Sequence, residues 1–169
     1  MFEHWGEFYL LAGSAAAVLI GLIFVVVTLM QDKSRSTMLY GSKLYMGPVV
    51  LQVSFVLVLS AAALTPNIGS RSYGLITAAV ALWGVIRGVQ SFLGIAGLTG
   101  EHAPHWSDKW CYGVLPTLIF LSLGLIAWGF WSDAAWAVHG VAIVATAILV
   151  LAIRNEWDLV TWLAPRADG

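Results

Sequence analysis

Hydrophobic residues fill long uninterrupted runs of this chain, and acidic and basic residues occur almost only between the runs. A membrane hydrocarbon core about 30 Å thick is crossed by a helix of about 20 apolar residues. Runs of this length predict five spans, over residues 8–30, 46–65, 73–98, 111–131 and 134–153. Strands of a membrane barrel would be shorter and would alternate polar with apolar positions, so we expect helices.

The five predicted spans make up one polytopic domain over residues 1–169. Only Ser132 and Asp133 separate the last two spans, which predicts a tight helical hairpin. In the tail 154–165, Trp157 and Val160 recur at three-residue spacing, as in a helix that lies on the membrane surface, although the tail could also continue the fifth span. We therefore expect an all-α integral membrane protein, a compact bundle with a short interfacial C-terminal helix.

Basic residues in the loops predict the orientation of the bundle, because loops on the cytoplasmic side carry an excess of Lys and Arg. With the N-terminus outside and the C-terminus inside, the external segments hold only Arg71. The cytoplasmic segments then hold Lys33, Arg35, Lys43, Lys109, Arg154 and Arg166. A bacterial cytoplasmic (inner) membrane is the simplest location for such a compact protein.

Composition excludes several functional classes. Hydrophobic residues make up 60% of the 169 residues and charged residues only 10%, whereas about 25% of the residues in soluble domains are charged. A net charge of −1 provides no basic surface for nucleic acid. The single cysteine, Cys111, rules out a disulfide framework.

Arg87 is the one charged residue inside a predicted span, and it lies near the middle of the membrane. All nine acidic residues lie outside the spans, so the chain has no carboxylate at the depth of Arg87. Charges at this depth are costly and mark functional sites by default. Gln90, Ser91 and Gln52 could solvate the guanidinium, as could a water-filled cavity or a bound or permeating anion.

Small residues recur at a spacing of four in two of the predicted spans. Gly13, Ala17 and Gly21 follow this spacing in the first span, and Gly84 and Gly88 in the third. Such patterns allow helix backbones to approach closely in a membrane. We expect these residues to pack helices within the chain more often than between chains.

Two pairs of histidines are candidate metal ligands. His102 and His105 lie in the loop before the fourth span, with Cys111 nearby, but Pro104 opposes a helix that would present both imidazoles on one face. His4 and His139 are both expected near the outer interface, where they could ligate a metal or haem if the tail folds over the hairpin.

Three functions remain open from these residues. The first is a small oligomeric channel or transport protein, which could conduct anions, with Arg87, Gln90, Ser91 and Gln52 lining a polar cavity. The second is a non-catalytic assembly factor or regulatory subunit that docks a membrane partner, and the third is a metal- or haem-binding membrane protein. The chain has no nucleophile elbow and no acid pair within a span, so we expect neither an enzyme nor a cofactor.

Overall fold

The computed structural model describes residues 2–29, 46–97 and 105–163, and in these ranges it contains helices and turns but no strand. This confirms the prediction of an all-α fold. The elements are α1 (Gly6–Leu29), α3 (Gly47–Ala63), α4 (Ser70–Ala96), α5 (Trp106–Lys109), the π-helical turn η3 (Trp110–Val114), α6 (Leu115–Trp131) and α7 (Trp136–Leu163).

Four helical stretches are long and apolar enough to cross a membrane, which agrees with a membrane-embedded protein. They are Gly6–Thr28, Ser70–Ala96, Trp106–Trp131 and Trp136–Thr161. The fifth long helix, α3, is also apolar but has only 17 residues. At 1.5 Å per residue it is about 26 Å long, slightly less than the thickness of the hydrocarbon core.

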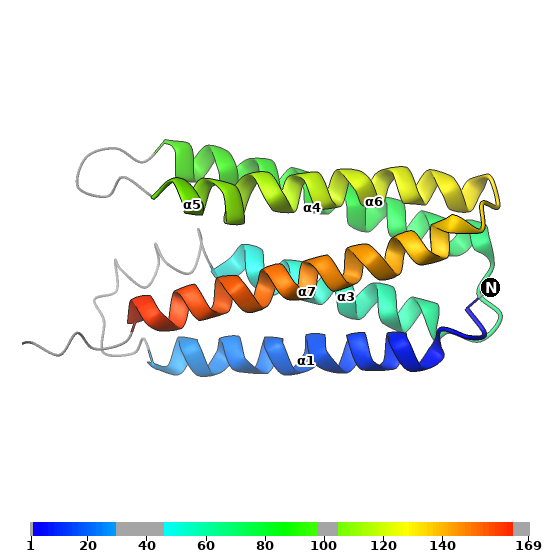
Figure 1. Cartoon of the computed structure of the whole chain (residues 1–169), viewed down its shortest axis with the longest axis horizontal. Helices are drawn as coiled ribbons and strands as arrows, with labels where there is room; N and C mark the ends of the chain where they lie inside the picture. The colour runs from blue at the N-terminus through cyan, green and yellow to red at the C-terminus, as the bar shows by residue number, and fades with distance from the viewer. Residues whose placement is uncertain (1, 30–45, 98–104, 164–169) are drawn as a thin grey trace, which may run out of the picture.

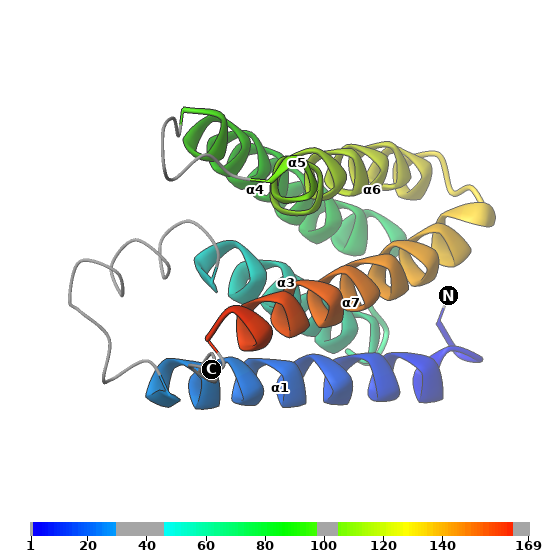
Figure 2. The same ribbon diagram turned by 60° about the vertical axis from the view of Figure 1, so that its left-hand side comes forward.

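The five long helices run along one axis of the molecule (Figure 1). Helices α4 and α6 form the most closely packed pair, and α1 and α3 form a second pair. Helix α7 lies between the two pairs and contacts α1, α3 and α6, as the turned view in Figure 2 also shows. We call the end of the bundle where α1 begins the N-terminal end, and the opposite end the α5 end.

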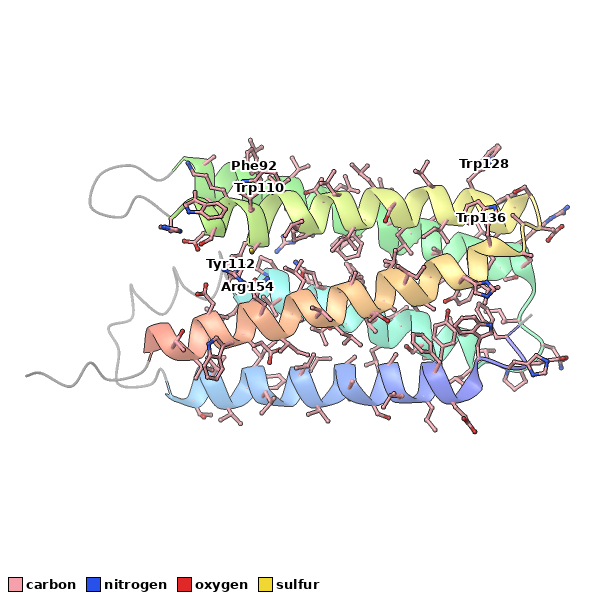
Figure 3. The ribbon with its side chains drawn as sticks, viewed as in Figure 1. Phe92, Trp110, Tyr112, Trp128, Trp136 and Arg154 are labelled. Carbon is pink, nitrogen blue, oxygen red and sulfur yellow. The ribbon has the colours of Figure 1, made fainter. Side chains whose placement is uncertain are left out.

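Exposed tryptophans mark both ends of the bundle. Trp128 and Trp136 lie at the N-terminal end, and Trp110 lies at the α5 end (Figure 3). All three are about half exposed or more. Such amphipathic rings favour the headgroup level of a bilayer, so their positions agree with a bundle that crosses the membrane along its long axis.

The tight hairpin expected between the last two spans is present as a connection of four residues, 132–135. Asp133 has a φ of 51° in this connection, a left-handed conformation that Asp tolerates better than most residues. The backbone N–H of Ala134 donates to the carbonyl of Gly129 at 2.9 Å, which closes the end of α6 in a Schellman-type cap.

Pro116 explains the π-helical turn η3, which lies at the start of the fourth predicted span. Proline has no backbone N–H, and its ring collides with the carbonyl four residues earlier in a regular α-helix. Here the preceding turn is wider, and the N–H of Leu115 donates to the carbonyl of Trp110, five residues back. The helix therefore continues without a break from Trp106 to Trp131, and it starts five residues before the predicted boundary.

The C-terminal tail differs from the separate interfacial helix expected over 154–165, because α7 runs unbroken to Leu163. Asn155 is fully buried within this continuation, and its side chain bonds to η3 at a distance of 3.3 Å. Packing against η3 keeps the last turns of α7 with the bundle, so the tail continues the fifth span.

Glycines on α4 allow it to touch α6. A Cβ added at Gly84 would overlap the ring of Phe120, and one at Gly88 would lie 2.5 Å from the hydroxyl of Thr117. Both glycines are buried. Gly84 and Gly88 therefore allow close packing of α4 against α6 within the chain.

The small residues of α1 do not all pack inward. A Cβ at Gly13 would meet the Cβ of Ser60 at 3.2 Å, but Ala17 and Gly21 are exposed, which corrects the expectation that they pack within the chain. A spacing of four drifts by about 40° per step around a helix of 3.6 residues per turn. The buried row alternates spacings of three and four instead: Tyr9, Ala12, Ala16, Leu19, Ile23 and Val26.

Gly84→Ala is expected to destabilise the folded protein by about 1–3 kcal/mol, the usual cost of overpacking a core. The ring of Phe120 is only 2% exposed, so it has little room to move away from the added methyl group. Thermal unfolding in detergent measures the effect. Gly21→Ala is the matched control, since no atom lies within 4 Å of its added Cβ, and equal melting temperatures for the two variants would contradict the close α4–α6 packing.

Candidate functional site

Arg87 lies on α4, about two and a half turns before the helix ends at Ala96. Its side chain is half-buried. One terminal nitrogen donates to Oε1 of Gln90 at 3.3 Å, and the Nε atom is buried without a hydrogen-bond partner. None of the described carboxylates pairs with Arg87, in agreement with the inventory of acids in the sequence.

The guanidinium borders a small crevice between α3, α4 and α6. The enclosed volume is about 10 Å³, close to the minimum needed for one water molecule. Two of the lining side chains, Arg87 and Gln52, are polar, and the others are Pro48, Leu51, Phe55, Gly84, Gly88, Pro116 and Phe120. Helix α3 therefore contributes the polar group that faces Arg87 across the crevice.

Gln52 is the second polar component of the crevice. It is only 5% exposed, and its Oε1 atom has no hydrogen-bond partner. One water molecule could accept from Nε of Arg87 and donate to this oxygen. The amide can equally be turned by 180°, since its O and N atoms are assigned from their surroundings, and its N–H donors would then face the crevice beside those of Arg87.

The four residues proposed from the sequence are only partly brought together. Gln52 and Arg87 share the crevice, and Gln90 contacts Arg87 from the exposed side of α4. Ser91 is 7% exposed, and its hydroxyl is buried without a partner, but it does not line the crevice. The polar site thus combines three of the four residues and leaves Ser91 apart.

The outward face of α4 places a polar pair on a surface that is otherwise apolar. Gln90 is exposed, and the exposed fractions of Trp83, Ile86 and Leu93 on this helix are 56%, 43% and 63%. A polar group that faces lipid has no water to bond with. The hydrogen bond between Arg87 and Gln90 therefore satisfies one guanidinium N–H on this face.

A second polar cluster, at the α5 end, was not found from the sequence. The hydroxyl of Tyr112 donates to the carbonyl of Asn155 at 3.1 Å and to a carboxylate oxygen of Asp158 at 3.4 Å. Arg154 donates to the side-chain oxygen of Asn155 at 3.1 Å. Tyr112 and Arg154 lie close together at this end of the bundle (Figure 3), so η3 and the last turns of α7 are joined by polar contacts.

Asn155 also supplies a hydrogen-bond donor that Pro116 lacks. In the wide π-type turn, the carbonyl of Cys111 would accept from residue 116, which has no N–H. The side-chain nitrogen of Asn155 donates to this carbonyl at 3.3 Å. A spacing of seven places Asn155 on the buried face of α7, with Val141 and Ile148, but this spacing does not identify Cys111 as its partner.

Glu156 is a buried carboxylate next to this cluster. It is 7% exposed, and its Oε1 atom has no hydrogen-bond partner. Its position follows Ala152 by one turn on the buried face of α7. A tail that lay on the membrane surface would leave this acid exposed. Glu156 is buried because α7 continues along the bundle.

The histidine loop is only partly described. His102 lies outside the described residues. His105 is exposed, and its Nδ1 atom accepts the backbone N–H of Ser107 at 3.4 Å, so the ring caps the short helix α5. No group of three side chains able to hold a metal ion occurs in the part of the chain that the structure describes.

His4 and His139 are both exposed at the N-terminal end. The N-terminal segment does fold toward the last hairpin, because the ring centroids of Trp5 and His139 are 5.0 Å apart and the rings are nearly perpendicular. An edge-to-face contact of this kind is a packing interaction. It gives His139 a role that does not depend on a metal.

No protein-family model, no curated protein and no solved structure matches this chain. The function therefore has to be inferred from the placement and chemistry of the chain's own side chains.

Asn155→Ala is expected to destabilise the protein by about 1–3 kcal/mol, because the carbonyl of Cys111 loses its donor in a partly buried setting. The measurement is thermal unfolding of the full chain in detergent. Thr161→Ala on the same helix is the control, since the hydroxyl of Thr161 is exposed and bonds only to carbonyls of its own helix. A melting temperature as high as that of the control would show that the hydrogen bond between Asn155 and Cys111 does not stabilise the fold.

Proposed function

We propose that this protein is a small membrane transport protein or channel that conducts anions and is assembled from several copies. The observation that carries the proposal is the half-buried Arg87, whose guanidinium has an unpartnered Nε beside Gln52 and bonds outward to Gln90. An intramembrane cation without a carboxylate partner is typical of an ion pathway.

Assembly from several copies follows from the size of the crevice. A volume of about 10 Å³ holds at most one water, so a passage through this part of a single chain is too narrow for a hydrated ion. The outward face of α4 carries Gln90 beside exposed apolar side chains. Symmetric association through this face would shield the polar pair from lipid and would gather several Arg87 side chains around one axis.

Selectivity for anions follows from the charge that such an arrangement brings together. Rings of Arg or Lys side chains favour anions and repel cations in membrane pores. Gln52 and Gln90 provide neutral groups that replace part of the hydration shell of an ion. The α5 end, which carries Lys109 and Arg154, faces the cytoplasm in this proposal, in a bacterial inner membrane.

Arg87→Gln is expected to lower the chloride flux into liposomes that contain the purified protein by about tenfold, equivalent to about 1.4 kcal/mol lost from the stabilisation of the passing anion. Arg71→Gln removes the same charge from an exposed position at the N-terminal end and is expected to leave the flux unchanged. Both variants must elute at the size of the parent. Absence of flux in the parent, or equal flux in all three proteins, would refute conduction through Arg87.

The proposed subunit contact is tested by cross-linking in membranes. Gln90→Cys in a Cys111→Ser background is expected to form a disulfide-linked dimer on mild oxidation, because the α4 faces of two copies would meet. Leu125→Cys in the same background is the control, since Leu125 is 72% exposed on α6. Equal cross-linking at the two positions would show random collision in place of a specific interface.

A second candidate is a non-catalytic subunit that docks a membrane partner. The exposed Trp157 and Val160, 71% and 41% accessible near the end of α7, favour it, because aromatic residues are enriched at protein interfaces. In this case a carboxylate of the partner would meet Arg87. Co-purification of a stoichiometric partner together with an absence of flux would support this candidate over a channel.

A further inference from the structure

A second hollow lies between α4 and the helix formed by η3 and α6. It is an open groove with a volume of about 170 Å³, far larger than the crevice at Arg87. The lining residues are Val89, Phe92, Gly113, Val114, Thr117 and Leu118. We call this hollow the α4–α6 groove.

The groove owes its shape to a close approach of two backbones. A Cβ at Gly113 would lie 2.8 Å from the Cβ of Phe92 and 2.9 Å from its Cα, so nothing larger than glycine fits at the floor. The hydroxyl of Thr117 donates to the carbonyl of Gly113 at 2.7 Å. The polar group of Thr117 is thereby used within its own helix, and the groove presents an apolar surface.

A basic residue and an aromatic residue, Lys109 and Trp110, precede the groove at the α5 end, and we call them the mouth of the groove. Lys109 and Trp110 precede Gly113 and Val114 by four residues, about one helical turn. Trp110 is 49% exposed and lies at the same end as Phe92 (Figure 3). No hydrogen bond or ion pair joins the Lys109 ammonium to another described residue.

The neighbouring acid does not occupy this mouth. Asp108 precedes the buried Tyr112 by four residues, on the side of the helix that faces α7. Its carboxylate accepts the hydroxyl of Ser107 at 3.4 Å. Asp108 therefore lies on the side of this turn that faces α7, and Lys109 lies on the side of the groove.

We propose that the α4–α6 groove binds one acyl chain of a phospholipid whose phosphate is held by Lys109. A phospholipid has an apolar acyl chain, which matches the apolar groove, and an anionic phosphate, which matches the basic Lys109. Basic residues at the ends of membrane helices bind lipid headgroups, and tryptophan favours that level of the bilayer. A side chain from a second copy could fill the apolar part but would leave Lys109 without an anion.

Native mass spectrometry of the full chain in detergent tests this site, with phosphatidylglycerol or phosphatidylcholine of identical acyl chains added in turn. The parent is expected to retain one phospholipid per chain more tightly than any further lipid. Val114→Phe fills the groove and is expected to abolish this retention. Leu125→Phe adds the same bulk to an exposed position of α6 outside the groove and is expected to retain the lipid.

Lys109→Gln is expected to weaken the retention of phosphatidylglycerol by about fivefold, the factor for one lost basic contact with an anionic lipid. All variants must match the parent in circular dichroism and elution volume. Equal lipid loss in the Val114 and Leu125 variants, or a parent spectrum in which lipids are only randomly attached, would overturn the proposal. A change of oligomeric size in Val114→Phe without loss of lipid would assign the groove to a second copy and would overturn it as well.

Discussion

The close approach of α4 to α6 positions the other features of this molecule. In a membrane the surrounding lipid is as apolar as the side chains, so helices associate through close van der Waals packing and through polar contacts. Gly84, Gly88 and Gly113 permit that packing, because a side chain at any of them would collide with the opposing helix. The crevice that holds Arg87 and the groove beside Phe92 both border this contact.

Pro116 imposes a second constraint on the same helix. Its missing N–H leaves a backbone carbonyl without a donor, and an unpaired carbonyl that is packed against another helix is costly. The wide turn η3 accommodates the proline, and the side chain of Asn155 donates to the carbonyl of Cys111. The donor missing from one helix is thus supplied by α7, from a residue 44 positions along the chain.

Two ionisable side chains remain incompletely satisfied inside the bundle. The Nε of Arg87 and one oxygen of Glu156 are both buried without a hydrogen-bond partner. A buried charge is costly unless it is paired or solvated. Arg87 also bonds to Gln90 on the outward face of α4, so its remaining partner can come from outside the chain, as an anion, a water or another subunit. This is the physical basis of the proposed assembly and of the passage that it would form.

The sequence by itself determined the all-helical class of the protein and the number of long helices, because the thickness of a bilayer converts apolar length directly into spans. It also placed Gln52 and Arg87 in one site from their residue types alone. Only the tertiary structure decided that Gly13 packs inward while Ala17 and Gly21 face outward, since a spacing of four drifts around the helix. The link between Asn155 and Cys111 likewise joins residues 44 positions apart, and no local pattern encodes which distant donor reaches an unpaired carbonyl.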